Sequence, residues 1–156
     1  MPAVFCKCWV AMGCLILTLP LAAGEPGVKA QFVGGTLSGV PGKTHSRLDL
    51  TGADTLVFHY GNTELGIAYR KINTVEYGQA VSRRYAEAVL ISPLLLLSKS
   101  RKHFVTIGYL DEEGKQQALV FRVEKGDIRS VLASLEARTG RRIEYQDNEA
   151  RKAGKG

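Results

Sequence analysis

The stretch that decides the fold is residues 56–77, which read LVFHYGNTELGIAYRKINTVEY. Large apolar side chains occupy every second position of residues 56–60, and this is the period of a half-buried β-strand. The pair Gly61-Asn62 follows, and such a pair between two alternating runs is typical of a tight hairpin. Residues 65–69 return with the same period, and residues 72–77 are expected to form a further short strand. The stretch therefore predicts three consecutive strands joined by short turns.

The same two-residue period recurs on both sides of this stretch. It is found in four further segments: Gln31 to Leu37, Arg47 to Leu50, Val105 to Leu110, and Leu119 to Val123. The last two segments are separated by the polar sequence DEEG at residues 111–114, which is typical of a turn. Together these patterns predict seven strands and hence a mainly β domain.

The period changes to that of a helix after residue 127. One apolar stripe recurs at positions i, i+3, i+4 and i+7, and it comprises Ile128, Val131, Leu132 and Leu135. Asp127 is suited to cap the start of this helix, and Gly140 is placed to end it in a left-handed conformation. A short extended segment is expected at residues 143–145.

The first 24 residues have the features of a secretory signal peptide. Lys7 is their only charge, an apolar block runs from Trp9 to Leu21, and the small residues Ala22-Ala23-Gly24 follow. A positive start, an apolar stretch of this length and small residues at its end are the parts of such a leader. The protein is therefore expected to be exported, either to the periplasm or out of the cell.

Alternatives to a leader cleaved after Gly24 stay open. The apolar block is short for an uncleaved anchor, because a spanning helix needs about 20 apolar residues. Lipid attachment at Cys14 is disfavoured because the apolar run follows this cysteine instead of preceding it. Residues 28–30 offer a second small-residue site for cleavage.

Cleavage after Gly24 would remove all three cysteines of the chain, Cys6, Cys8 and Cys14. Removing 24 of the 156 residues leaves 132, with 20 basic and 15 acidic side chains and a net charge of +5. This composition excludes a disulfide scaffold, a thiol nucleophile, a cysteine–zinc site and an iron–sulfur cluster in the mature chain. The positive charge fits an anionic envelope surface. Nucleic acid is not expected as a partner, because the aromatic residues lie within strand patterns and not among the basic residues.

Seven short antiparallel strands followed by one amphipathic helix resemble the pleckstrin-homology-like fold. The run LGIAYRKINTVEY at residues 65–77 is similar to the pattern I-x-Y-x-x-I-x-x-[VL] of its bacterial PH/GRAM-like members. The resemblance covers roughly Gln31 to Gly140, and it implies a seven-stranded, partly open barrel capped by the helix. The chain also resembles small exported bacterial proteins of unknown function.

The first hairpin departs from the pattern of the phosphoinositide-binding members of that family. Those members carry a basic pattern K-x(n)-[KR]-x-R around this hairpin. The present chain offers Lys43, His45 and Arg47, without the middle basic residue. Recognition of inositol phosphates is therefore not carried over from the resemblance.

An apolar insertion at residues 81–103 stands between the fifth and sixth predicted strands. Its central part, Ala88 to Leu97, contains ten residues without a charge, which is too short to span a bilayer. Pro93 prevents one unbroken helix, so a short helix to about residue 91 and then a leucine-rich turn or strand are expected.

Three interpretations of this insertion stay open. It can pack across the open end of the barrel, since a small domain needs every apolar contact. It can enter a membrane surface, with each basic residue near anionic head groups contributing about 1 kcal/mol, or its leucines can be buried in a protein interface. In the last two cases the contact residues would be Arg83, Arg84, Tyr85, Leu94, Leu95, Leu96, Leu97, Lys99, Arg101 and Lys102.

The sequence contains no recognisable catalytic or metal-binding pattern. His45, His59 and His103 are isolated from one another, and none has a carboxylate at ligand spacing. No nucleophile elbow of the form G-x-S-x-G is present. The acidic residues 111–113 would hold a cation only loosely, and a solvated hairpin tip is the simpler interpretation. We therefore expect no enzyme, no metal and no cofactor.

These patterns predict a signal peptide at residues 1–24, a pleckstrin-homology-like domain at 25–146 and a charged, disordered tail at 147–156. The expected function is that of a non-catalytic binding module of the bacterial envelope, which contacts a membrane surface through the basic-flanked apolar insertion. The alternative is a protein-interaction or oligomerisation domain that uses the same leucines and has no lipid role.

Overall fold

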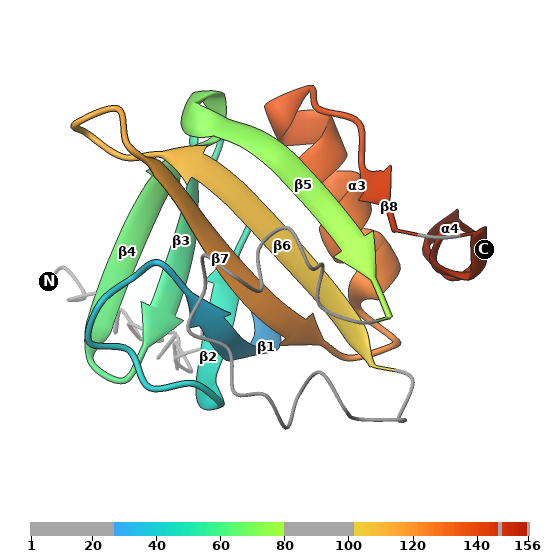
Figure 1. Ribbon diagram of the computed structural model, residues 1–156, viewed down its shortest axis with the longest axis horizontal. Coiled ribbons are helices and arrows are strands. Elements are labelled where there is room, and N and C mark those ends of the chain that lie inside the picture. The colour runs from blue at the N-terminus through green and yellow to red at the C-terminus, as the bar shows by residue number, and fades with distance from the viewer. Residues whose placement is uncertain (1–26, 80–101, 147, 156) are drawn as a thin grey trace, which may run out of the picture.

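A computed structural model describes residues 27–79, 102–146 and 148–155 of the chain (Figure 1). The predicted leader lies outside these residues, and so does the insertion apart from its last two residues, Lys102 and His103.

Eight strands, two α-helices and one 3-10 turn make up the described part. In chain order they are β1 (Val28–Gly35), β2 (Thr44–Asp49), β3 (Thr55–Tyr60), β4 (Thr63–Ala68), η1 (Tyr69–Lys71), β5 (Ile72–Gly78), β6 (His103–Leu110), β7 (Gln116–Val123), α3 (Ile128–Thr139), β8 (Glu144–Tyr145) and α4 (Asn148–Lys155).

All eight strands belong to one open sheet with the order β4-β3-β2-β1-β7-β6-β5-β8. Neighbouring strands are antiparallel, except that β8 pairs in parallel with β5 over two residue pairs. The seven predicted strands are all present, and β8 corresponds to the short extended segment expected at residues 143–145. The prediction of a mainly β fold with a C-terminal helix is confirmed.

The hairpin predicted at Gly61-Asn62 joins β3 to β4 by a two-residue turn, with Tyr60 paired to Thr63. Gly61 has a φ of 55°, a left-handed conformation that a glycine adopts without steric cost. The return strand ends at Ala68, one residue earlier than its period predicted, because Tyr69 begins the 3-10 turn η1 that leads directly into β5.

Three phenylalanine rings show that the sheet is strongly bent. Phe32 on β1, Phe58 on β3 and Phe121 on β7 have pairwise ring-centroid distances of 5.5, 5.9 and 5.0 Å. Strands β3 and β7 are three positions apart in the sheet order, which corresponds to about 14 Å in a flat sheet. The contact between Phe58 and Phe121 therefore requires the sheet to curl around its inner face, which holds the main core.

Helix α3 completes that core at the β5 side of the molecule, where Figure 1 also places β8 and α4. Its four predicted stripe residues, Ile128, Val131, Leu132 and Leu135, are all buried in the core. Gly140 ends the helix with a φ of 64°, as predicted, and its N–H donates to the carbonyl of Glu136. Asp127 stands at the N-cap position, but its side chain makes no capping hydrogen bond.

Arg138, in the last turn of α3, ties the helix to the opposite half of the sheet. Its guanidinium donates to the carbonyls of Gly52 and Thr51 in the β2–β3 connection. The same group lies 5.7 Å from the ring centroid of Tyr69 in η1, within the range of a cation–π contact. Burial is the main reason why the pKa of Tyr69 is raised. These contacts hold the helix across the end of the sheet.

The C-terminal residues differ from the sequence-based expectation. Charge and small side chains predicted a disordered tail, whereas residues 148–155 form α4. Ala150 is fully buried and belongs to the core, so one apolar contact anchors this otherwise polar helix. Composition alone does not predict such a contact, because the contact depends on where the chain lies when it leaves β8.

We expect Phe121→Ala to lower the free energy of unfolding by about 3–5 kcal/mol, because it removes the ring that contacts both other phenylalanines. Urea denaturation followed by circular dichroism measures this change. Leu110→Ala is the matched control, since Leu110 is 39% exposed and its truncation should cost well under 1 kcal/mol. Equal costs for the two variants would show that the phenylalanine contacts do not organise the fold.

Candidate functional site

Most residues that the sequence predicted to contact a membrane or a partner lie outside the described part of the chain. This holds for Arg83, Arg84, Tyr85, Leu94, Leu95, Leu96, Leu97, Lys99 and Arg101. Lys102 is described; it is half-buried and directly precedes β6. The hypothesis of a membrane or partner contact through these residues therefore stays a prediction.

A different cluster of polar residues lies on the outer face of β1–β4 and β7. Alternation along each strand separates it from the core. On β3, for example, Leu56 and Phe58 are buried in the core, whereas Val57 and His59 are only partly buried on the opposite face. The outer face of these strands therefore presents their polar side chains.

Strand register brings the outer-face residues of four strands into one row. Glu64 on β4 pairs with His59 on β3, His59 pairs with Arg47 on β2, and Arg47 pairs with Lys29 on β1. Directly paired residues of antiparallel strands have Cβ atoms about 4.5–5.5 Å apart. A contiguous row of ionisable side chains thus crosses the four strands β4, β3, β2 and β1.

A second, parallel row crosses the three strands β2, β1 and β7. It runs from His45 through Gln31 to Arg122, again as direct register pairs. The two rows border a groove of about 1060 Å³, which we call the outer groove. Its lining comprises Lys29, Ala30, Gln31, His45, Ser46, Arg47, His59, Gly61, Asn62, Thr63, Glu64, Arg122 and Glu124.

Gln31 fixes the position of the Arg122 side chain in the outer groove. The Gln31 amide donates to the carbonyl of Lys43 at 3.2 Å, and its oxygen accepts from the Arg122 guanidinium at 3.5 Å. Lys43 itself has a φ of 70°, and its N–H donates to the carbonyl of Phe32 at 2.7 Å. The Lys43 backbone thus orients the Gln31 amide, and this amide in turn orients the Arg122 guanidinium.

The His59 side chain is largely enclosed, with 29% of it exposed, compared with 69% for Glu64. Its Nδ1 lies 3.1 Å from a carboxylate oxygen of Glu64. Its Nε2 is buried and has no hydrogen-bond partner among the described residues. A ligand oxygen would satisfy Nε2 when the ring is protonated, and a ligand donor would satisfy it when the ring is neutral.

The charge of the outer groove is mixed with a positive excess. Lys29, Arg47 and Arg122 are permanent cations, against the two carboxylates Glu64 and Glu124. Glu64 is already engaged by His59. Of the described residues, only Gln31 accepts a hydrogen bond from the Arg122 guanidinium, which carries five donors in all. This arrangement can bind an anionic group with several hydrogen-bond acceptors.

Sequence reasoning did not find the outer groove. It considered the three histidines as isolated from one another. The residues of the groove come from five strands, the β3–β4 turn and the residue after β7, and they span positions 29 to 124. The only signal available was the polar character of alternate positions in these strands, which indicates an outer face but not which strands lie side by side.

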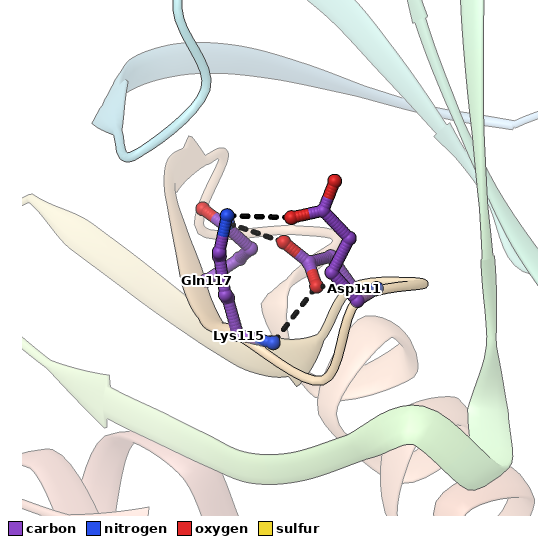
Figure 2. A network of polar contacts seen from close by, with 4 residues as sticks. Asp111, Lys115 and Gln117 are labelled. Atoms are coloured by element: carbon purple, nitrogen blue, oxygen red, sulfur yellow. Dashed lines mark hydrogen bonds and ion pairs between the residues drawn. The ribbon is translucent and has the colours of Figure 1, made fainter.

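The acidic turn between β6 and β7 is a structural element. Asp111 Oδ1 accepts from the backbone N–H groups of Glu113 and Lys115, at 2.9 and 2.8 Å, and Oδ2 accepts from the Gln117 amide at 2.8 Å. Figure 2 shows these side chains gathered at the turn. The Gln117 hydrogen bond, followed by that of the Lys115 backbone, lowers the pKa of Asp111. The carboxylate thus organises the hairpin.

The described residues contain no cluster of three or more histidine, cysteine, aspartate or glutamate side chains placed to hold a metal ion. None of the helices in residues 27–79, 102–146 and 148–155 is long and apolar enough to cross a membrane.

Comparison with known proteins adds no relative. No protein-family model matches the chain, and no curated protein matches it in sequence.

We expect the protein to lose stability in acid partly through Asp111. Because the folded-state pKa of this carboxyl is lowered, its contribution is present at neutral pH and is lost as the pH falls below about 4. Asp111→Asn should lower the Tm at pH 7, and its difference from the wild type should shrink towards pH 3. Thermal denaturation between pH 7 and pH 3 measures this difference.

The neighbouring exposed carboxylate provides the control for this prediction. Glu112→Gln should follow the wild-type pH profile, since the turn network uses Asp111 and not Glu112. A pH profile of Asp111→Asn that runs parallel to the wild type would contradict the role assigned to Asp111.

Proposed function

We propose that this protein is an exported, non-catalytic binding module of the bacterial envelope, and that it binds an anionic, phosphate-bearing group in the outer groove. At a membrane surface that group is the head group of an anionic lipid. The observation that carries the proposal is the placement of Lys29, Arg47 and Arg122 on the neighbouring strands β1, β2 and β7, where they line one groove together with the hydrogen-bonding side chain of Gln31.

The chemistry of the groove favours an anion with several oxygens. Arg122 presents a planar fork of donors that matches phosphate geometry, and Gln31 holds that fork in place. Lys29 adds a point charge on the neighbouring strand β1. Preorganised donors lower the conformational entropy that is lost on binding.

The mixed lining argues for a small polar head group rather than a long polyanion. Glu64 and Glu124 stand at the same groove and would repel a continuous run of negative charge. A single phosphate with polar substituents can contact the cations while its substituents meet the carboxylates. Inositol-phosphate specificity is not part of the proposal, since the first hairpin lacks the family pattern for it.

The fold is compatible with a pleckstrin-homology-like module, which we include in the proposal. Its support is the open bent sheet of seven antiparallel strands, the added strand β8, and a C-terminal helix packed against the core. The proposed export rests on the leader-like residues 1–24 and on the absence of cysteine from the remaining sequence.

We expect the exported protein to co-sediment with vesicles that contain phosphatidylglycerol and not with pure phosphatidylcholine vesicles. The double variant Lys29→Gln/Arg122→Gln should bind about tenfold to thirtyfold more weakly, since each basic residue near an anionic surface contributes about 1 kcal/mol. Binding of the wild type should fall as salt is raised, because screening shortens the reach of exposed charges.

A matched control separates the groove from the net charge of the protein. Arg129→Gln/Arg142→Gln removes the same charge from exposed positions in and after α3, away from the groove. This control should bind as the wild type does. Equal losses in both double variants would contradict a groove site and indicate non-specific attraction.

One further experiment distinguishes the source of the phosphate. Titration with glycerol 1-phosphate, followed by calorimetry, tests whether the isolated group binds and whether the groove variant abolishes that binding. Binding of glycerol 1-phosphate without vesicle binding would assign the site to a soluble ligand. Binding to neither, together with self-association that rises with concentration, would overturn the proposal in favour of the protein-interaction hypothesis.

A further inference from the structure

His59 lies inside the charged row that borders the outer groove. Register pairs it directly with Glu64 of β4 on one side and with Arg47 of β2 on the other. Directly paired residues have Cβ atoms about 4.5–5.5 Å apart, so the imidazole stands between an anion and a cation. The charge of this ring therefore decides the charge balance of the row.

The two ring nitrogens of His59 have different surroundings. Nδ1 lies 3.1 Å from a carboxylate oxygen of Glu64, close enough to donate a hydrogen bond to it. Nε2 is buried and has no hydrogen-bond partner among the described residues. A buried polar atom without a partner is rare in folded proteins, and a functional role is one of its recognised explanations.

The carboxylate of Glu64 selects the tautomer of the neutral ring. An acceptor beside Nδ1 favours the tautomer that carries its proton on Nδ1, so Nε2 is then a bare acceptor. Such a nitrogen cannot form a hydrogen bond with a phosphate oxygen. Protonation of the ring adds a hydrogen to Nε2 and makes it a donor, which a phosphate oxygen can accept.

Protonation of His59 also doubles the positive excess of the described groove lining. Three permanent cations against two carboxylates leave an excess of one positive charge while the histidines are neutral. A proton on His59 raises this excess to two, and the ring then forms a full ion pair with Glu64. The carboxylate that would repel a phosphate is thus neutralised by its own neighbour.

Among the described residues, the other charged groups that face His59 are Glu64 on β4 and Arg47 and Asp49 on β2. The Thr51 hydroxyl, followed by the Thr51 backbone N–H, lowers the pKa of Asp49, so this carboxylate stays ionised. Between pH 7.5 and pH 5.5, histidine is the side chain that ordinarily changes its charge. His45, which is exposed on β2, is the second histidine of the groove.

We propose that His59 is a proton-dependent ligand contact of the outer groove, which binds a phosphodiester head group tightly when the ring is protonated and weakly when it is neutral. Nε2–H donates to a phosphate oxygen, while Nδ1–H donates to Glu64. Because proton and ligand favour each other's binding, affinity rises as the pH falls. This inference rests on the proposed function of the groove and adds a contact residue and a pH dependence to it.

Vesicles of phosphatidylglycerol test this dependence, because the phosphodiester of that lipid has no proton to lose between pH 7.5 and pH 5.5. A phosphate monoester is a poor probe, since its second proton dissociates at about pH 6. In co-sedimentation, the exported protein should bind these vesicles about fivefold more tightly at pH 5.5 than at pH 7.5. This is the effect of one added positive charge near an anionic surface.

His59→Gln should abolish this increase, because glutamine does not titrate. Its affinities at the two pH values should agree within about twofold. His103→Gln is the matched control, since it removes a histidine at the start of β6, outside the described lining of the groove. This control should keep the fivefold increase.

Glu64→Gln provides a second variant, at a side chain that is 69% exposed and whose replacement the fold should tolerate. The groove then loses a negative charge, so binding at pH 7.5 should be about fivefold tighter than in the wild type. The increase between pH 7.5 and pH 5.5 should shrink, because the protonated ring has lost its counter-ion.

The outcomes separate this inference from the proposed function. Wild-type binding that is equal at both pH values, or an increase that His59→Gln retains, would overturn the inference and leave the phosphate site in place. An increase that only His45→Gln removes would assign the proton to His45 and overturn it as well. Absence of vesicle binding at both pH values would contradict the proposed function, and this inference would fall with it.

Discussion

The contact between the Phe58 and Phe121 rings is the constraint on which the rest of the structure depends. It joins strands that are three positions apart in the sheet, and Phe32 fills the angle between them. A sheet curled in this way has an enclosed inner face, and α3 can complete that face from one side. Without the curl, the inner side chains of β3 and β7 would belong to separate surfaces.

The same curl gives the two halves of the sheet different outer faces. Most residues of β5, β6 and β7 are buried, on both faces of the sheet. The strands β2, β3 and β4 alternate, so their outer faces carry polar and ionisable side chains. One half of the sheet therefore provides the scaffold, and the other half provides the surface on which the outer groove lies.

The residues around the outer groove are held in position mainly by hydrogen bonds to backbone groups and less by pairs of side chains. Gln31 is held by the carbonyl of Lys43, and the left-handed residue Lys43 is held in turn by the carbonyl of Phe32. The turn network of Asp111 does the same for the β6–β7 hairpin, with two backbone donors on one carboxylate oxygen. In both places, a polar side chain forms hydrogen bonds with the backbone of a loop or turn and thereby fixes its geometry.

The sequence alone determined the elements whose signals are local. Alternation predicted the seven strands, Gly61-Asn62 predicted the β3–β4 hairpin, and the stripe from Ile128 to Leu135 with Gly140 predicted α3 and its end. These patterns suffice because strand and helix periods are set by neighbouring residues on the same segment. The sequence did not predict that the Asp127 side chain makes no capping hydrogen bond, nor that residues 148–155 form α4. Both outcomes depend on contacts made elsewhere in the chain.

Only the tertiary structure decided which strands are neighbours and which side chains lie together on one face of the sheet. The outer groove combines Lys29, Arg47, His59 and Arg122, which are far apart in the chain and become neighbours through the order β3-β2-β1-β7 and its register. The pairing of β1 with β7 closes a loop of most of the domain, and no local pattern encodes it. Register is fixed by the mutual fit of apolar faces in the core, so the candidate site is a consequence of packing and not of any motif.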